Sequence, residues 1–186
     1  MTSDLKNKLI NIARDKYPAS DPAHDFEHIF RVLNLAIRIA TEEKADLDVI
    51  IPAALFHDLV SYSKDDPRNK NATEESAQES GKILESISEF PKQKIPQVQS
   101  AIETCSFSKG IKTDILENQI LQDADGLEAT GALAVMRTFA TSGIMKRMFF
   151  HPQDPFAKNR ELDDLKYSLD LFSTRLLKVI DRMHTN

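Results

Sequence analysis

The sequence predicts a single all-helical domain. Glycine occurs only five times in 186 residues, whereas sheets need many turns with positive φ and helices need few. No sustained alternation of apolar and polar residues marks a hairpin, and apolar residues recur at helical spacing instead. With 41% hydrophobic residues, a chain of this length can bury a core without disulfides or metal staples. We therefore expect residues 1–186 to form one globular bundle of about eight helices.

Eight segments show helical periodicity, and local signals justify several of their boundaries. They run over 3–17, 25–44, 47–60, 72–88, 91–107, 111–121, 125–140 and 162–183. Ser3 or Asp4 is the expected N-cap of the first helix, and Asp46 that of the third. The second predicted helix, over 25–44, carries its apolar residues on one face. The third contains the run VIIPAALF, which is apolar nearly all round and predicts a central helix. Pro52 within it predicts a kink or a late start.

The second half of the chain alternates polar loops with helices. Residues 61–70 form a charged loop, and Asn71 with Glu74 three positions later is a capping-box pattern for the next helix. The seventh segment is almost entirely small or apolar, so we expect a central helix that Asp125 opens. An irregular stretch over 142–161 precedes the last helix.

Charge and composition exclude several classes of function. The formal net charge of −5 and the absence of a basic stripe argue against binding a nucleic-acid polymer. A small anionic substrate remains compatible, because a bound dication would supply positive charge locally. The N-terminus has no apolar signal region, and no stretch approaches the length of a membrane span. The lone Cys105 fits a reducing compartment, and a cytoplasmic location is expected.

Four groups of residues are candidates for chemistry. They are the pair His24 and His28, the adjacent His57 and Asp58, the pair Asp123 and Asp125, and the charged loop 64–70. Each has a structural alternative. The first pair is one helical turn apart, a spacing that is more often incidental than metal-binding. His57 could be a cation at a helix C-terminus, although an adjacent carboxylate is unfavourable there. Asp125 with Glu128 matches a capping box.

Taken together, these residues favour a metal site. Imidazole and carboxylate groups at the ends of buried helices are costly unless they are paired or bind a metal. Neutral imidazoles with carboxylates suit divalent ions in a mixed nitrogen and oxygen site that keeps positions open for water. The chain offers no cysteine pair for a structural zinc. The set of ligands therefore indicates catalysis.

The order of these residues resembles the signature of the HD-domain superfamily of phosphohydrolases. The surrounding segments AHDFEHIFRV, LFHDLVSYSK, QDADGLEATGALAVMRTFA and DPFA are similar to those of small bacterial HD hydrolases of unassigned substrate. The resemblance covers about residues 20–180, with its core motifs in 20–140. It implies an HD-type helical bundle. Many members continue beyond the point where this chain stops. We therefore expect that a further C-terminal helix is missing from this sequence.

The resemblance also implies roles for individual residues. The metal ligands would be His28, His57, Asp58 and Asp125. His24 would lie near the site and contact substrate without binding the metal. Asp123 would orient a ligand or a water. Lys64 matches a basic position of the subgroup and would contact substrate phosphate.

The chain departs from its relatives at three places. Cys105 begins a CSFS segment where relatives often read HSFS, and Gly126 stands where they have arginine. The extra histidines that give some HD proteins a second metal are not apparent in 60–80. A site for one metal ion is therefore favoured.

The expected mechanism is hydrolysis by metal-activated water. One divalent ion, with Mn²⁺, Fe²⁺, Co²⁺, Ni²⁺, Zn²⁺ and Mg²⁺ all open, would polarise a phosphoryl oxygen and lower the pKa of a bound water. Asp58 is a ligand, and a second carboxylate would accept the proton of that water. The candidates for that second carboxylate are Asp65, Asp66 and Asp123. Lys64 and Arg68 would stabilise phosphate charge. Lys146, Arg147 and His151 could close over the substrate.

Three functions remain open at this point. The first is a phosphohydrolase acting on a small phosphorylated substrate, most simply a nucleotide. The second is a metal-bearing regulatory or ligand-binding module without turnover, which the changes at Cys105 and Gly126 favour. The third is a phosphodiesterase of cyclic dinucleotides, which usually needs two metals. The substrate and the oligomeric state, a homodimer among the options, are not determined.

Overall fold

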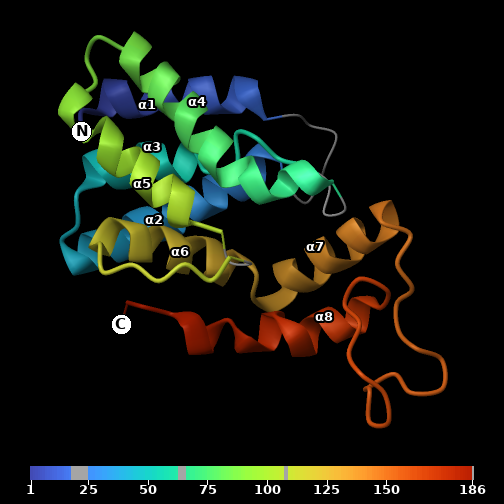
Figure 1. The fold of residues 1–186 in the computed structure, drawn as a ribbon. Helices are drawn as coiled ribbons and strands as arrows, with labels where there is room; N and C mark the ends of the chain where they lie inside the picture. The colour runs from blue at the N-terminus through green and yellow to red at the C-terminus, as the bar shows by residue number, and fades with distance from the viewer. Residues whose placement is uncertain (18–24, 63–65, 107–108, 186) are drawn as a thin grey trace.

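The computed structural model describes residues 1–17, 25–62, 66–106 and 109–185. Within these ranges the chain forms eight α-helices and four short 3₁₀ helices (Figure 1). They are α1 (Ser3–Lys16), α2 (Phe26–Glu43), α3 (Leu47–Phe56), η1 (Pro67–Asn71), α4 (Ala72–Ser86), η2 (Lys92–Lys94), α5 (Ile95–Thr104), α6 (Leu116–Glu128), α7 (Gly131–Ile144), α8 (Ser168–Thr174), η3 (Leu176–Lys178) and η4 (Ile180–Arg182). The described residues include no strand beyond one isolated bridge between Met148 and Tyr167. The predicted all-α fold is confirmed.

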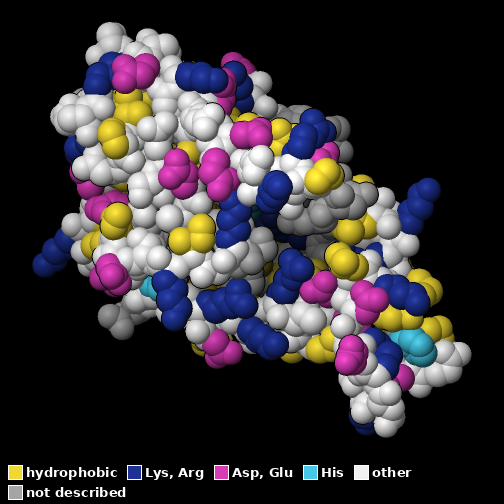
Figure 2. All heavy atoms as spheres, viewed as in Figure 1, with side chains coloured by type: hydrophobic (Ala, Val, Ile, Leu, Met, Phe, Trp, Pro, Cys, Tyr) yellow, Lys and Arg dark blue, Asp and Glu magenta, His cyan; other side chains and the backbone are white. Residues whose placement is uncertain are grey.

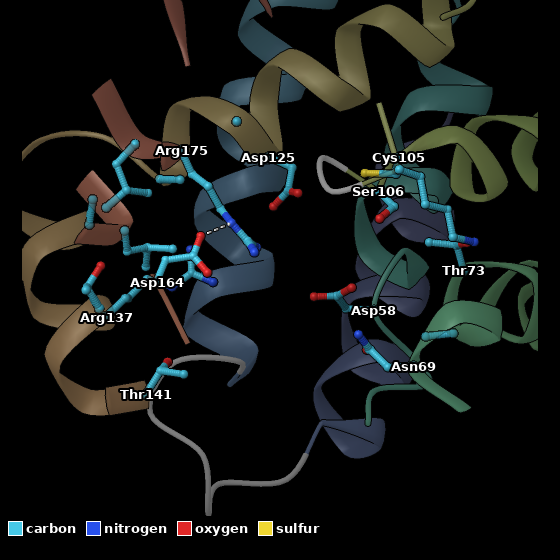
Figure 3. Close-up of a pocket in the computed structure, with 18 of the residues that line it drawn as sticks. Asp58, Asn69, Thr73, Cys105, Ser106, Asp125, Arg137, Thr141, Asp164 and Arg175 are labelled. Atoms are coloured by element: carbon cyan, nitrogen blue, oxygen red, sulfur yellow. Dashed lines mark hydrogen bonds and ion pairs between the residues drawn. The ribbon is translucent and has the colours of Figure 1, made fainter. Parts of the chain in front are cut away.

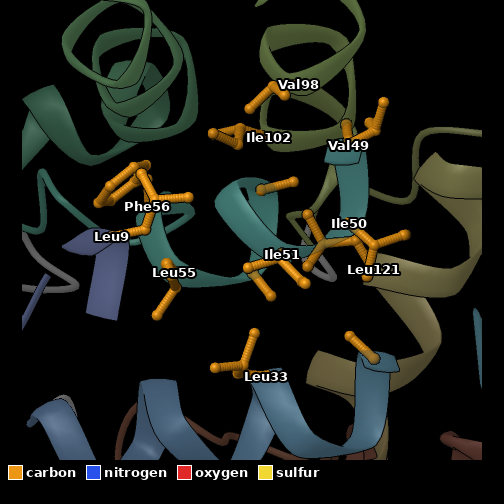
Figure 4. Packing of buried hydrophobic residues seen from close by; sticks show 14 of the residues in the cluster. Leu9, Leu33, Val49, Ile50, Ile51, Leu55, Phe56, Val98, Ile102 and Leu121 are labelled. Atoms are coloured by element: carbon orange, nitrogen blue, oxygen red, sulfur yellow. The ribbon is translucent and has the colours of Figure 1, made fainter. Parts of the chain in front are cut away.

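Helix α3 is the centre of the bundle. It packs against α1, α2, α4, α5 and α6, and every residue from Val49 to Phe56 is buried (Figure 4). Asp46 caps the helix as predicted, because its carboxylate accepts a hydrogen bond from the Asp48 amide at 2.9 Å. Pro52 lies inside a helix that already begins at Leu47, so the late start does not occur. The apolar surround of α3 thus follows directly from its sequence.

One predicted N-cap is wrong, and a second lies at the predicted place without its side-chain bond. Thr2, one residue earlier than expected, caps α1 by accepting from the Leu5 amide at 3.3 Å. Asn71 makes no side-chain cap on α4, because η1 runs directly into that helix and holds Asn71 in a helical conformation. A capping side chain needs an extended backbone at the cap, which this junction does not provide.

The segment predicted as one helix over 125–140 is divided between two helices. α6 ends at Glu128, and α7 begins at Gly131, whose φ of +63° lies in the left-handed region that favours glycine. Asp125 therefore lies in the last turn of α6 and does not open a helix. Its proposed capping box with Glu128 is wrong for the same reason. α7 is also not central, since Met136 is 67% exposed.

The C-terminal region is less regular than predicted. The helix expected over 162–183 is reduced to α8 and the turns η3 and η4. The carboxylate of Asp170 binds Arg160 and the Asp163 amide, and these bonds hold the preceding residues in a loop. α7 and α8 pack against each other beside α6 (Figure 1). No helix among the described residues combines the length and apolarity needed to cross a bilayer.

Candidate active site

Three helices of the core bring the predicted metal ligands together. His28 lies in the first turn of α2, His57 follows the end of α3 directly with Asp58 next to it, and Asp125 lies in α6. α2, α3 and α6 pack on one another, so residues nearly one hundred positions apart meet at one rim of the core. The two imidazoles are buried, whereas the side chains of Asp58 and Asp125 remain 33% and 26% exposed.

Both imidazoles present Nε2 to the same two carboxylates. His28 Nε2 lies 3.9 Å from Asp58 Oδ2 and 3.6 Å from Asp125 Oδ1. The corresponding distances from His57 Nε2 are 3.8 and 3.9 Å. Two ligand atoms that are each about 2.1 Å from one metal ion lie at most about 4.2 Å apart. His28, His57 and Asp125 offer ligand atoms that all lie within 4.8 Å of one another, and the Asp58 carboxylate lies within 4 Å of both Nε2 atoms.

The hydrogen bonding of His57 also fits a metal ligand. Its Nδ1 lies 2.9 Å from the Ala54 carbonyl oxygen, an acceptor, so Nδ1 carries the proton. That tautomer leaves a lone pair on Nε2, which is buried and makes no hydrogen bond to any described residue. A buried polar atom without a partner is costly. A metal ion would satisfy it.

Glu128 is a member of the site that the sequence analysis missed, because it was assigned to a capping box. Its carboxylate is 1% exposed, pairs with Arg31 Nε, accepts from Arg137 Nη1 at 2.8 Å, and lies 3.6 Å from His28 Nδ1. Burial favours the neutral acid, but the interactions with His28, Arg31 and Arg137 prevail and lower the pKa of Glu128 to about 2. Its spacing of three residues from Asp125, which places both on one helix face, was the available signal.

The metal-ligand cluster forms part of the wall of a cavity of about 750 Å³. Figure 3 shows two walls, with Asp58, Asn69 and Thr73 from the core on one side and Arg137, Thr141 and Arg175 from the C-terminal region on the other. The cavity has the size of a small-molecule site. Among the described residues, five lysines and arginines line it: Lys70, Lys109, Arg137, Arg147 and Arg175. In Figure 2, Lys and Arg side chains gather around the hollow between these two parts of the molecule.

Several of these basic groups have carboxylate partners. Arg175 Nε lies 3.0 Å from Asp164 Oδ2, and Lys109 Nζ lies 2.9 Å from Glu74. Arg147 donates from Nε to the Leu165 carbonyl at 3.3 Å, and burial lowers the pKa of its guanidinium. The wall opposite the metal cluster therefore carries positively charged guanidinium groups. They have protein partners, but they line the cavity and can reach a ligand.

The loop residues predicted to bind substrate are only partly described. His24, Lys64 and Asp65 lie outside the described residues. Arg68 is exposed, pairs with Asp66 at 2.7 Å and stacks over the Tyr62 ring, and it does not line the cavity. Asp66 does line the cavity, but hydrogen bonds from Arg68 lower the pKa of its carboxylate. The structure therefore does not bring Arg68 to the metal cluster.

Among the described residues, Asp123 contacts the C-terminal segment and none of the predicted metal ligands. It is buried, and its carboxylate accepts hydrogen bonds from the amides of His184 and Thr185 at 2.7–3.0 Å. The Thr185 hydroxyl donates to it as well. Two residues before Asp125 on the same helix, its side chain points to a different face and attaches the C-terminal segment to α6.

The 142–161 stretch contributes one of the three residues named for it. Arg147 lines the cavity, whereas Lys146 and His151 do not. His151 Nδ1 accepts from the amides of Gln153 and Asp154 and packs its ring on Tyr167. The missed residues Arg137 and Arg175 lie in or after helices, where a lone arginine carries no sequence signal of function.

Comparisons with known proteins show which family this chain resembles. The model of the HD domain family matches residues 25–130. The uncharacterised protein YpgQ of Bacillus subtilis (strain 168) is 32% identical over 126 residues, which is 64% of this chain. The match spans 58% of that relative's length.

Two solved structures are similar over nearly the whole chain. The crystal structure of Bacillus subtilis YpgQ in complex with ADP has a TM-score of 0.69 and 27% identity, and the match covers 97% of this chain and 84% of that one. An HD-superfamily hydrolase from Bacillus thuringiensis has a TM-score of 0.68 and 27% identity, with coverage of 98% and 84%. The family match covers more than half of the chain, and the His28, His57–Asp58 and Asp125 cluster lies within it, so this protein belongs to the HD domain family.

Proposed function

We propose that this protein is a metal-dependent phosphohydrolase that acts on a small phosphorylated substrate, most simply a nucleotide. The observation that carries the proposal is one cavity with the cluster of His28, His57, Asp58 and Asp125 on one wall and arginines on the other. A phosphate group between these walls would meet the metal ion and the guanidinium groups at once. That is the arrangement that phosphoryl transfer requires, since its catalysis depends on positioning and charge stabilisation.

The residues of the core wall would hold the metal ion. His28 and His57 would bind through Nε2 and Asp125 through a carboxylate oxygen. Asp58, whose carboxylate lies within 4 Å of both Nε2 atoms, would be the fourth ligand. A divalent ion held there supplies Lewis-acid activation of a phosphoryl oxygen and of an attacking water. Asp66 is the remaining candidate for the proton acceptor among the described residues, although its lowered pKa makes it a weak base.

The opposite wall would bind the substrate. Arg137, Arg147 and Arg175 offer fork-shaped donors that suit phosphate oxygens. Leu165, Leu171, Leu176 and Val179 also line the cavity and offer apolar surface to a base or a sugar. The complex of YpgQ with ADP, a similar protein, supports a nucleotide as the ligand.

The alternative of a module without turnover rests on Cys105. This residue lines the cavity beside the cluster, at a position where the family resemblance implies histidine. Burial, followed by the charges of Asp125 and Asp58, raises the pKa of its thiol. A neutral thiol can replace neither the basicity nor the metal affinity of an imidazole. If that position takes part in proton transfer, the chain would bind metal and nucleotide without hydrolysing it.

The deciding experiment measures bound metal by elemental analysis and then turnover. About one ion per chain is expected in the wild type after reconstitution with Mn²⁺, lost in Asp125→Ala and retained in the exposed control Asp114→Ala. Release of phosphate or pyrophosphate from a nucleotide panel with Mn²⁺ would support hydrolysis. Bound metal without any turnover would favour the module without turnover. Absence of metal in the wild type would contradict both the hydrolase and this module.

A further inference from the structure

The two histidines of the cluster are held by different groups. His57 is held by the backbone, because its Nδ1 donates to the Ala54 carbonyl. His28 instead has a side chain behind it, since its Nδ1 lies 3.6 Å from Glu128 Oε2. In both rings the Nε2 atom faces the carboxylates of Asp58 and Asp125. His28 thus has a carboxylate behind it that mutation can remove, whereas His57 has a backbone carbonyl.

Glu128 is built into this position from three helices. Arg31 on α2 is one turn beyond His28, and Glu128 on α6 is one turn beyond Asp125. Helices α2 and α6 therefore supply the ligands His28 and Asp125, and one helical turn later they supply the ion pair of Arg31 and Glu128. Arg137 on α7 binds the same Oε2 atom that faces His28.

The charge of Glu128 requires these partners. Its carboxylate is 1% exposed, and a buried carboxylate is costly unless it is paired and hydrogen-bonded. Arg31 and Arg137 provide two partners, with side chains 33% and 19% exposed. The Oε2 atom also lies 3.6 Å from His28 Nδ1, slightly beyond hydrogen-bond length.

We propose that Glu128 is a positioning residue that holds the His28 ring with its Nδ1 proton toward the carboxylate and its Nε2 lone pair toward the metal. The inference rests on the proposed metal site. A carboxylate behind a metal-bound imidazole fixes its tautomer and raises its basicity, and loss of such a partner lowers metal affinity about 10–100-fold. Arg137 adds a link from the substrate wall to the metal wall, because it lines the cavity and binds Glu128.

The test compares Mn²⁺ affinity, measured by isothermal titration calorimetry, in the wild type, Glu128→Gln and Asp170→Asn. Asp170 is the matched control, since it is another buried carboxylate paired with an arginine, Arg160, but it does not line the cavity. Glu128→Gln is expected to weaken Mn²⁺ binding about 10–100-fold. Asp170→Asn is expected to lower thermal stability and leave the Mn²⁺ affinity unchanged.

A second measurement needs no variant and covers the case in which Glu128→Gln does not fold. Two-dimensional ¹H–¹⁵N NMR of the metal-free wild type reports which ring nitrogen of His28 carries the proton. The proposal expects a proton on Nδ1, and a proton on Nε2 alone would overturn it. Equal Mn²⁺ affinity in Glu128→Gln and wild type would also overturn it while leaving the proposed function standing. Absence of Mn²⁺ binding in the wild type would instead remove both.

Discussion

The helices α1–α6 and the region after them differ in how much apolar surface they bury. Every member of the buried hydrophobic cluster lies between Leu5 and Ala124. Most exposed large apolar residues of the described chain lie later: Leu127, Leu133, Val135, Met136, Ile144, Met148, Phe149, Phe150, Phe156, Leu162, Leu165, Leu177 and Ile180. The first region is held by burial of apolar surface. The second has few buried side chains of its own.

The C-terminal region is attached to the core mainly by directional contacts. The Asp123 carboxylate holds the amides of His184 and Thr185, and Arg137 binds Glu128. Gly126 adds a close approach, since a Cβ there would lie 3.2 Å from the Met183 side chain. Hydrophobic burial is strong but non-directional, whereas hydrogen bonds position groups. The core should therefore determine stability and hold the metal, and the later region should determine what the cavity binds.

The largest expected effect concerns metal binding by two histidines, one from each region. His57→Ala removes a metal ligand and should reduce Mn²⁺ affinity more than about 100-fold, beyond the loss expected for an outer partner. His184→Ala changes an exposed side chain whose backbone amide makes the contact, so affinity should stay at the wild-type value. Elemental analysis after dialysis would compare them, and equal loss in both variants would contradict the division of roles.

The next effect separates the two regions by stability. Leu121 is fully buried in the core, and Leu177 is 72% exposed. Leu121→Ala should lower the free energy of unfolding by about 2–5 kcal/mol through lost burial and a cavity. Leu177→Ala should change it by no more than about 0.5 kcal/mol. Urea denaturation would measure both, and similar costs would mean that the later region carries a core of its own.

A smaller effect tests a buried ion pair of the C-terminal region. Hydrogen bonds from Arg160, opposed by burial and assisted by the Asp163 amide, hold the pKa of Asp170 below its ordinary value of 3.8. A carboxyl with a lowered folded-state pKa stabilises the fold above its unfolded pKa and loses that contribution as pH falls below it. Asp170→Asn should therefore cost about 1–3 kcal/mol at pH 7.

The difference in melting temperature between wild type and Asp170→Asn should shrink as pH falls below the ordinary carboxyl pKa of 3.8, because the unfolded wild-type chain then binds a proton that the folded chain takes up only at lower pH. A difference independent of pH would show that Asp170 acts through packing alone.

The smallest expected effect concerns ligand binding by the C-terminal wall. Arg175→Gln removes a guanidinium from the cavity and should weaken ADP binding about tenfold, roughly 1.4 kcal/mol, with metal content unchanged. Asp164→Asn removes the carboxylate that pairs with Arg175 at 3.0 Å, so ADP should bind more tightly. Calorimetric titration of ADP into the Mn²⁺-loaded protein would test both. A loss of metal in Arg175→Gln would contradict the assignment of metal binding to the core alone.

Sequence patterns predicted the core better than the later region. The buried α3 and its Asp46 cap follow from an apolar run and a local capping rule, and both are confirmed. The break between α6 and α7 was missed because ATGALAV reads as helix throughout, and only the left-handed backbone at Gly131 interrupts it. The long C-terminal helix failed because Asp170 forms contacts with Arg160 and Asp163 that helical periodicity cannot anticipate.

The sequence by itself determined the all-helical fold and the central place of α3, because these depend on local periodicity. It also supplied the candidate metal ligands, but through short motifs that resemble those of the HD family and are far apart in the chain. Only the tertiary structure decided that Asp123 attaches the C-terminal segment while Asp125 faces the histidines, and that Glu128 lies behind His28. It also placed Arg137 and Arg175 across a cavity from the metal ligands. Those facts depend on which face of one helix meets which face of another, and that is settled by packing across the whole chain.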